Sequence, residues 1–376
     1  MKKVCALLLA FALVCAVFGI GLTFKGLIVR NDDTNSTADA GEVPQDNERV
    51  DEDDNSETTL PMEEETIPLI VTASDASVFY YNQLNDTEKE YYRLIGEKMD
   101  DFIHNIPVCL VEFNDEKGFS ERESAERALK AYRLDNPISS IWLNDTKIVW
   151  WWISEKVGED EYIKHKEGFY VAPYGIGYSY GLFHYVNSEY DVPQMIQKVE
   201  EKTQVFVQTL DGLNNRQKVV EISRWLIEDC KYVNMRNYPN DGNLYGPIVG
   251  KYGRCAGDSM AFKYVCDMAE VPCIIVEGVG FTPRDGKTIE EFMTEREEMG
   301  NYGPNHAWNA TLTEEGWTVT DNTNNRDIQK ITSENPNEDD EEVVYATDSW
   351  LLIDQNTDIF MSTHALCGND RFQYPE

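Results

Sequence analysis

The stretch Gly253-Arg254-Cys255-Ala256-Gly257 decides the fold, because a helical pattern starts directly at its cysteine. The side chains that follow at helical spacing fall on one face: Ser259, Phe262, Cys266 and Ala269. The thiol is therefore predicted at the N-terminus of a helix. Unpaired backbone N–H groups and the helix dipole stabilise a thiolate there, as a reactive cysteine requires. The backbone N–H of this cysteine would also point toward a developing oxyanion.

A β-hairpin carrying a histidine and an aspartate is predicted downstream of this helix. Residues 305–312 are predicted as one strand, the turn Thr313-Glu314-Glu315-Gly316 follows, and residues 317–320 are predicted as the next strand. His306 and Asp321 lie near opposite ends of this segment. Antiparallel pairing of the two strands would bring them side by side.

The cysteine, the histidine and the aspartate together predict an acyl-transferring thiol enzyme. Cys255 would be the nucleophile, and His306 would pair with its thiolate and protonate the leaving amine. Asp321 would fix the imidazole tautomer and support the imidazolium. A lone cysteine or histidine is more often structural, so the combination of all three in this order carries the prediction.

The segment from about residue 219 to 325 resembles the core of the transglutaminase-like superfamily of papain-type cysteine enzymes. Four motifs carry the resemblance: Arg224-Trp225-Leu226 in a helix, the Gly-x-Cys-x-Gly helix start, the His-Ala-Trp-Asn strand and Trp-x-x-x-Asp-x-Thr. The ending from Trp350-Leu351-Leu352-Ile353 to His364 is similar to the family's closing strand and tail. The resemblance implies an α+β fold in which the cysteine-bearing helix packs on an antiparallel sheet bearing the histidine and the aspartate.

Two positions depart from the family's pattern. Asp258 stands where the family usually has an aromatic residue, and Asn322 replaces the common proline after the aspartate. A carboxylate three residues after the nucleophile would either weaken thiolate formation or select a cationic substrate. Asp258 is therefore one candidate for substrate binding. Trp308, two residues after the histidine, is the other.

The second oxyanion donor is expected from the loop that precedes the cysteine. Residues 234–253 hold two prolines and four glycines, which predicts an irregular surface segment beside a site. Tyr245 and Tyr252 are the candidate donors in this loop, and the alternative for both is a packing role.

The remaining cysteines predict neither a disulfide framework nor a metal site. Of eight cysteines, two lie in the N-terminal apolar run, and the spacing of the others is wide and irregular. Cys266 and Cys273 do not form the tight Cys-x-x-Cys pair that zinc would need. Most of these cysteines are expected to be buried thiols, and no metal or other cofactor is predicted.

The N-terminus predicts a membrane anchor. Residues 4–24 form an uncharged apolar run of 21 residues, and a helix needs about 20 to cross a bilayer. A single-pass anchor at residues 1–30 with the rest of the chain outside the cytoplasm is the favoured interpretation. Cleavage with secretion, or lipid attachment at Cys15, is the alternative.

The charge distribution predicts an acidic tether and excludes some partners. The net charge of −35 argues against binding to nucleic acid or to an anionic membrane surface. Residues 31–75 hold 15 Asp and Glu against one Arg, which is −14 of that total. Self-repulsion predicts a disordered, extended linker there.

A smaller α+β domain is predicted at residues 76–192, ahead of the transglutaminase-like domain at residues 193–376. Asn85 with Glu88, and Ser120 with Glu123, form the capping-box pattern of two helix starts. Strand-rich segments are expected at 148–153 and 169–172, and a Gly/Tyr-rich segment at 174–185. Trp150-Trp151-Trp152 would pack within a sheet or, alternatively, form a platform for sugar rings. Residues 79–143 resemble a domain that precedes such cores in anchored bacterial surface proteins.

The sequence therefore predicts an extracytoplasmic thiol enzyme that acts on amide bonds through an acyl-enzyme. Its substrate would be a protein or a peptide, cell-wall peptides included. Protease, amidase and transglutaminase activities all stay open, because the acceptor can be water or an amine. The alternative is a non-catalytic cell-surface binding module that retains the fold, and Asp258 motivates it.

Overall fold

The computed structural model places the described residues in one compact unit, Glu64–Glu376. The described residues are 70, 72–103, 108–112, 118–143, 148–156, 162–171, 176–179, 182–185, 191–233, 240–283, 286–331, 341–367 and 372–375. The expected span at residues 4–24 and nearly all of the acidic linker lie outside them. Within these ranges no helix combines the length and the apolar character that a bilayer crossing needs.

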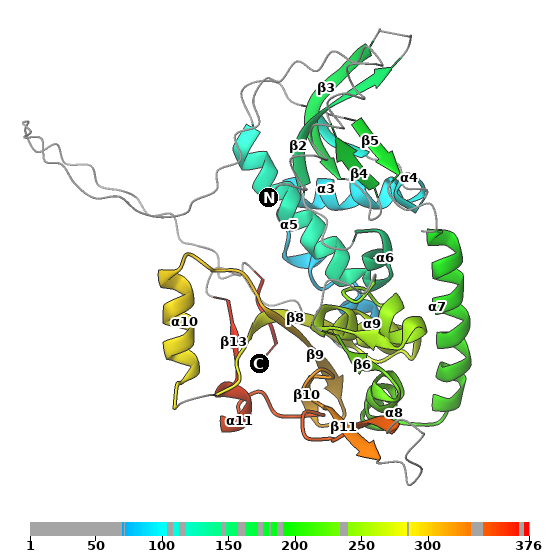
Figure 1. The fold of residues 1–376 in the computed structure, drawn as a ribbon, viewed down its shortest axis with the longest axis vertical. Helices are drawn as coiled ribbons and strands as arrows, with labels where there is room; N and C mark the ends of the chain where they lie inside the picture. Colours follow the sequence, from blue (N-terminus) through cyan, green and yellow to red (C-terminus); the bar gives the residue numbers. More distant parts are fainter. Residues whose placement is uncertain are drawn as a thin grey trace, which may run out of the picture. The chain divides into compact units, whose positions relative to one another are not determined.

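Helices and strands alternate irregularly along the chain (Figure 1). The α-helices are α2 (Ala73–Ala76), α3 (Asp86–Glu97), α4 (Met99–Ile103), α5 (Gly118–Asp135), α6 (Ser140–Leu143), α7 (Val192–Val207), α8 (Asn215–Ile227), α9 (Cys255–Met268), α10 (Ile289–Glu298) and α11 (Asp358–Met361). Shorter helical turns are η1 (Tyr81–Gln83), η2 (Pro137–Ser139), η3 (Gln208–Leu210) and η4 (Gly246–Gly250). The strands are β1 (Val108–Glu112), β2 (Ile148–Lys156), β3 (Tyr162–Val171), β4 (Ile176–Ser179), β5 (Leu182–Tyr185), β6 (Lys231–Tyr232), β7 (Tyr252–Gly253), β8 (Cys273–Gly280), β9 (His306–Thr313), β10 (Gly316–Thr320), β11 (Arg326–Ile331), β12 (Glu341–Ala346) and β13 (His364–Leu366).

An antiparallel sheet in the order β10-β9-β8-β13 is the centre of the transglutaminase-like part. Helix α9 packs on β8 and β9 (Figure 1). The central strand β8 is buried on both faces, as its apolar run Cys273-Ile274-Ile275-Val276 requires. The predicted arrangement of the cysteine-bearing helix on an antiparallel sheet is confirmed.

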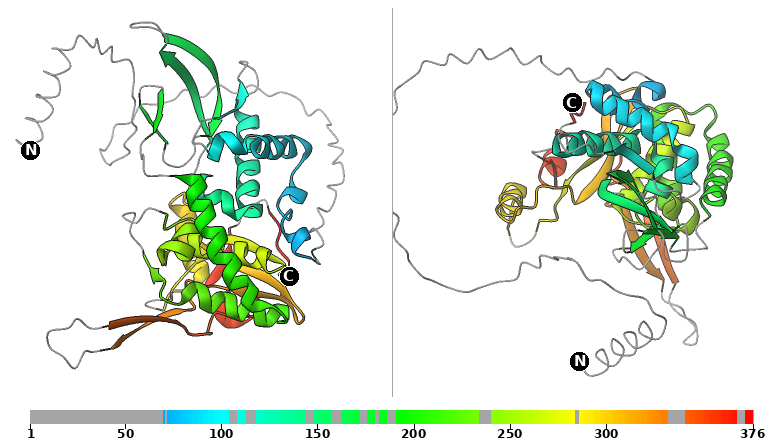
Figure 2. Two further views of the ribbon diagram at one scale, coloured as in Figure 1. Left: turned by 90° about the vertical axis from the view of Figure 1, so that its right-hand side faces the viewer. Right: turned by 90° about the horizontal axis from the view of Figure 1, so that it is seen from above.

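The predicted hairpin is formed by β9 and β10. Its register pairs Gly316 with Thr313 and Thr320 with Asn309. Gly316 has a φ of +106°, which a glycine adopts in this tight turn without steric cost. The next two strands, β11 and β12, form a separate two-stranded ribbon (Figure 2).

The ending from Trp350 to His364, which is similar to the family's closing strand and tail, contains no strand at residues 350–353. Ile353 exchanges paired backbone hydrogen bonds with Val319 at 2.8 and 2.9 Å, and the carbonyl of Trp350 accepts one from the backbone N–H of Asp321 at 2.9 Å. Leu352 has a φ of +55°, which interrupts an extended backbone. The fourth strand of the sheet is β13, which pairs with β8.

Of the two predicted capping boxes in the preceding region, one is confirmed and one is wrong. Asn85 caps α3 and exchanges both hydrogen bonds with Glu88. Helix α5 begins at Gly118, so Ser120 lies inside its first turn and is not the cap. The helix ends at Asp135, directly before Asn136-Pro137.

The helices of residues 73–143 share one hydrophobic core with the sheet, so the structure does not divide at residue 192. Phe79, Tyr80 and Trp142 are buried in the same cluster as the apolar face of α9. The Tyr80 hydroxyl donates a hydrogen bond to the backbone carbonyl of Ile275 on β8. These long-range contacts replace the separate core that local patterns suggested.

The strands predicted at residues 148–153 and 169–172 are present in β2 and β3. With β1 they form a three-stranded sheet in the order β1-β3-β2, and the Gly/Tyr-rich segment contains the pair β4–β5. Trp150, Trp151 and Trp152 lie on β2, paired with residues 167–169 of β3. The strand is thus confirmed, and the alternative of a sugar platform concerns side chains outside the described part of the structure.

Candidate active site

Cys255 is the first residue of α9, as predicted. The residue before it, Arg254, is extended and makes no side-chain capping hydrogen bond to the first turn. Cys255 is partly exposed, whereas the other described free thiols are buried: Cys230, Cys266, Cys273 and Cys367. The thiol at the helix N-terminus therefore differs from the rest in both exposure and local field.

The loop before the helix presses against its first turn. A Cβ on Gly257 would lie 2.4 Å from the carbonyl oxygen of Asp241 and 3.0 Å from that of Asn243. The second glycine of the Gly-x-Cys-x-Gly motif is thus a site of close backbone approach.

Replacing Gly257 with Ala is expected to destabilise the protein by about 1–3 kcal/mol, because the loop backbone must move to admit a methyl group. Urea unfolding would measure the change. Gly303→Ala is the matched control, since a Cβ there meets no atom within 4 Å. Equal stability of the two variants would contradict the close approach.

His306 opens β9 and reaches the aspartate as predicted. Its Nε2 lies 2.7 Å from Oδ2 of Asp321, which directly follows β10. The imidazole occupies the space above Gly280 on β8, where a Cβ would come within 2.8 Å of the ring. The glycine therefore makes room for the histidine, and Gly280 lies outside the motifs that predicted the site.

Asp321 is buried, and both of its carboxylate oxygens accept hydrogen bonds. Its Oδ1 accepts hydrogen bonds from the backbone N–H groups of Thr323 (3.0 Å) and Asn324 (3.2 Å). Its Oδ2 accepts from the Asn324 side-chain amide at 2.6 Å and contacts two imidazoles, His306 and His364. A buried carboxylate with this many donors is held in one orientation.

The charges of the site favour an imidazolium beside a carboxylate. Burial lowers the pKa of His306, but Asp321 and a hydrogen bond with Cys255 outweigh it and raise the pKa to about 10. Burial raises the pKa of Asp321, yet His306 and His364 outweigh it and hold that pKa well below its usual range. Since Nε2 of His306 faces Asp321, Nδ1 is the nitrogen left for the thiol.

Stability is expected to fall as the pH rises from about 8.5 to 10. Above pH ~8.5 an unfolded histidine and an unfolded cysteine have both lost their protons, whereas folded His306 keeps its proton to about 10, so unfolding releases a proton in this range. Urea unfolding of the wild type and His306→Gln would show this as a stability difference that shrinks with rising pH. A difference independent of pH over this range would contradict the raised pKa.

Asp258 has a different place from the one predicted. It is 3% exposed and pairs with Arg326, whose Nη2 lies 3.1 Å from Oδ1. The Thr323 hydroxyl donates to its Oδ2 at 3.0 Å. A carboxylate that is buried and neutralised in this way neither presents a free charge to the thiol nor faces a cationic substrate.

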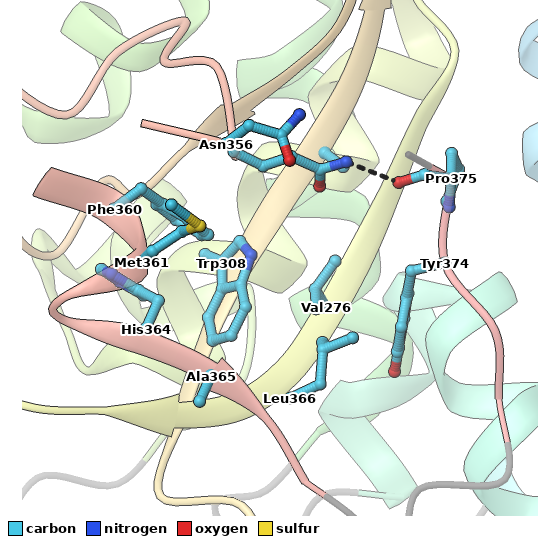
Figure 3. A pocket seen from close by; sticks show the side chains of 12 residues that line it. Val276, Trp308, Asn356, Phe360, Met361, His364, Ala365, Leu366, Tyr374 and Pro375 are labelled. Atoms are coloured by element: carbon cyan, nitrogen blue, oxygen red, sulfur yellow. Dashed lines mark hydrogen bonds between the residues drawn. The ribbon is translucent and has the colours of Figure 1, made fainter. Parts of the chain in front are cut away.

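Trp308 is a wall of a cavity of about 280 Å³ rather than an open surface (Figure 3). It is 3% exposed, and its ring packs edge-on against His364 at a centroid distance of 5.0 Å. Phe360 and Tyr374 line the same cavity. A role in substrate binding stays a prediction for this residue.

Tyr245 and Tyr252 also stay predictions as oxyanion donors. The backbone N–H of Tyr245 donates to Asn243 Oδ1 at 2.9 Å, and its ring packs against the core. Tyr252 lies on β7, and its ring fills the space above Gly250. These contacts give both rings a packing role in the loop.

His364 is the member of the site whose role the sequence did not reveal. One nitrogen of His364, one nitrogen of His306 and one carboxylate oxygen of Asp321 lie within 4.8 Å of one another, close enough to bind one metal ion. Such a donor set also suits zinc. The carboxylate oxygen that would face an ion is already the acceptor of both imidazoles and of the Asn324 amide, so we interpret the group as a hydrogen-bond network.

Comparison with known families identifies the domain. Residues 204–322 match the family model of the transglutaminase-like superfamily. This third of the chain is therefore a transglutaminase-like domain, and it contains the cysteine, the histidine and the aspartate described above. No curated protein matches the chain.

Two solved structures are similar at low identity. A crystal structure of a TGase is 11% identical, covers 62% of this chain and has a TM-score of 0.26. The chain spans only 53% of that structure's length. The periplasmic domain of TgpA from Pseudomonas aeruginosa bound to ethylmercury is 14% identical, with a TM-score of 0.22, covering 47% of this chain and 69% of that one.

Proposed function

We propose that the protein is an extracytoplasmic thiol enzyme that acts on amide bonds of proteins or peptides, cell-wall peptides included. The observation that carries the proposal is the arrangement at the N-terminus of α9. Cys255 begins this helix and contributes to the raised pKa of His306, and His306 Nε2 lies 2.7 Å from Asp321 Oδ2. A partly exposed thiol, a partly buried imidazole and an oriented carboxylate are the parts that acyl transfer needs.

The proposed reaction has two stages. The Cys255 thiolate attacks the amide carbon, the C–N bond breaks, and His306 gives its proton to the leaving amine. In the second stage His306 takes a proton from water or from an acceptor amine as that molecule attacks the thioester carbon. The C–S bond then breaks and restores the Cys255 thiolate beside the imidazolium. Asp321 stays ionised throughout and balances the imidazolium. The backbone N–H of Cys255 would donate to the oxyanion.

The position of Asp258 supports activity. The alternative of a non-catalytic binding module was motivated by an unpaired carboxylate near the thiol. Because Arg326 neutralises that carboxylate, no described contact now favours the alternative. The extracytoplasmic setting rests on the apolar run at residues 4–24.

A p-nitrophenyl ester tests the proposal without knowledge of the natural substrate. We expect a burst of nitrophenol and an acetyl group on Cys255 in an acid-quenched sample, detected by peptide mass spectrometry. An added primary amine that captures the acetyl group would indicate transamidation, and its release as acetate would indicate hydrolysis. Cys255→Ala is the control. The proposal fails if the acetyl group forms on no cysteine, or equally on the buried ones.

A further inference from the structure

A second histidine contacts the same oxygen of the Asp321 carboxylate as the first. His364, the first residue of β13, places its Nε2 3.1 Å from Asp321 Oδ2, the atom that also meets His306 Nε2. On the far side of its ring, Nδ1 lies 2.9 Å from the Thr363 hydroxyl. Both ring nitrogens therefore have polar partners, which is the arrangement that fixes an imidazole in one orientation.

Aromatic rings hold His364 in place. Phe360 stacks on it with a centroid distance of 4.4 Å and an interplanar angle of 4°. Trp308 meets it edge-on, and Trp350 packs at 5.3 Å. The side chain is 1% exposed, although its ring borders the cavity beside Trp308 (Figure 3).

We propose that His364 is a positioning residue for the reaction of Cys255: by donating its Nε2 proton to Asp321, it holds that carboxylate in the orientation that His306 needs. This inference rests on the proposed function. His364 does not contact the reacting thiol among the interactions described, so it acts through Asp321 and His306.

The tautomer of His364 follows from its two partners. A neutral ring protonated on Nδ1 would turn the Nε2 lone pair toward the carboxylate, which is repulsive. The neutral Nε2–H tautomer and the charged ring both donate to Asp321 instead. The Thr363 hydroxyl suits either form, because it can donate to Nδ1 or accept from it.

An apolar ring would fill the same space but would leave Asp321 with one donor fewer. Burial disfavours the ionised form of this carboxylate, and donors offset that effect. The titratable side chains that the His364 ring meets are Asp321 and His306, whose ring lies at 5.5 Å. Loss of the donor would thus loosen the carboxylate and, through it, the imidazole that faces the thiol.

Three variants separate positioning from packing. His364→Phe keeps an aromatic ring and removes the donor, His364→Gln keeps an N–H group that can reach Asp321, and Phe360→Leu removes the stacking ring but keeps the donor. Each variant is first checked for a cooperative thermal transition. The first readout is the rate of Cys255 alkylation by iodoacetamide from about pH 5 to 9. The second is kcat and KM on the p-nitrophenyl ester.

We expect His364→Phe to lower kcat and the alkylation rate near neutral pH by about tenfold or more, with KM little changed. Its alkylation profile should shift toward that of an ordinary thiol. His364→Gln should recover most of the loss, and Phe360→Leu should change the rates much less. Wild-type rates and profile in His364→Phe would overturn the inference, and so would equal losses in His364→Phe and Phe360→Leu.

The test distinguishes this inference from the function on which it rests. If Cys255 of the wild type reacts no faster than an ordinary thiol, the proposed function fails and the inference fails with it. If the wild-type thiol is activated and all three variants match it, the inference alone fails.

Discussion

Replacing Asp321 with Asn is expected to lower kcat by up to about 10⁴-fold, the loss found when the aspartate of a Ser-His-Asp triad becomes an asparagine. The Asp321 carboxylate accepts a hydrogen bond from His306 Nε2 at 2.7 Å, which keeps the imidazole proton on that nitrogen. An amide can turn a donor toward that nitrogen, which moves the imidazole proton to the side of the thiol. His306 would then neither pair with a thiolate nor accept a proton from the attacking acceptor.

The measurement is the steady-state rate on the ester substrate, with the variant's fold checked by circular dichroism. Asp358→Asn is the matched control, because Asp358 is an exposed carboxylate at the start of α11. The control should keep the wild-type rate. A loss of less than about tenfold in Asp321→Asn would show that the carboxylate does not orient the imidazole.

Removing the carboxylate of Asp258 is expected to destabilise the protein by about 3–5 kcal/mol, as happens when one partner of a buried ion pair is lost. In this ion pair the Arg326 side chain is 3% exposed and the Asp258 side chain is 4% exposed. The Nε and Nη1 atoms of Arg326 have no hydrogen-bond partner within the described structure, so the guanidinium depends strongly on this carboxylate.

Urea unfolding of Asp258→Ala gives the free energy directly. The control is Glu315→Ala, which breaks the exposed pair with Arg216 and should cost at most about 1 kcal/mol. Adding Arg326→Met to Asp258→Ala should recover part of the loss, because the uncompensated charge disappears. An Asp258→Ala variant no less stable than Glu315→Ala would contradict the buried pair.

Local signals predicted most of the site. A helix start shows in the spacing of small and apolar residues after Cys255, and a hairpin shows in two strand patterns around a turn that contains Gly316. The expected pairing of the two strands then placed His306 beside Asp321. These features depend on residues close together in the chain, and the structure contains each of them.

The parts that the sequence did not predict depend on distant pairing. Arg326 lies 68 residues from Asp258, and His364 lies 43 residues from Asp321. Neither contact follows from a local pattern, because each requires the strands to be placed in the sheet first. The same holds for Tyr80, whose local surroundings suggested a separate domain but whose hydroxyl reaches β8.

The pH dependence of Cys255 alkylation tests most directly whether Cys255, His306 and Asp321 act as one unit. An ordinary thiol loses reactivity about tenfold for each pH unit below ~8.5, because only the thiolate reacts. Beside the His306 imidazolium, Cys255 should lose reactivity toward iodoacetamide less steeply than an ordinary thiol as the pH falls below neutral. His306→Gln should restore the ordinary tenfold slope. A wild-type profile with that ordinary slope, unchanged by His306→Gln, would contradict the proposed triad.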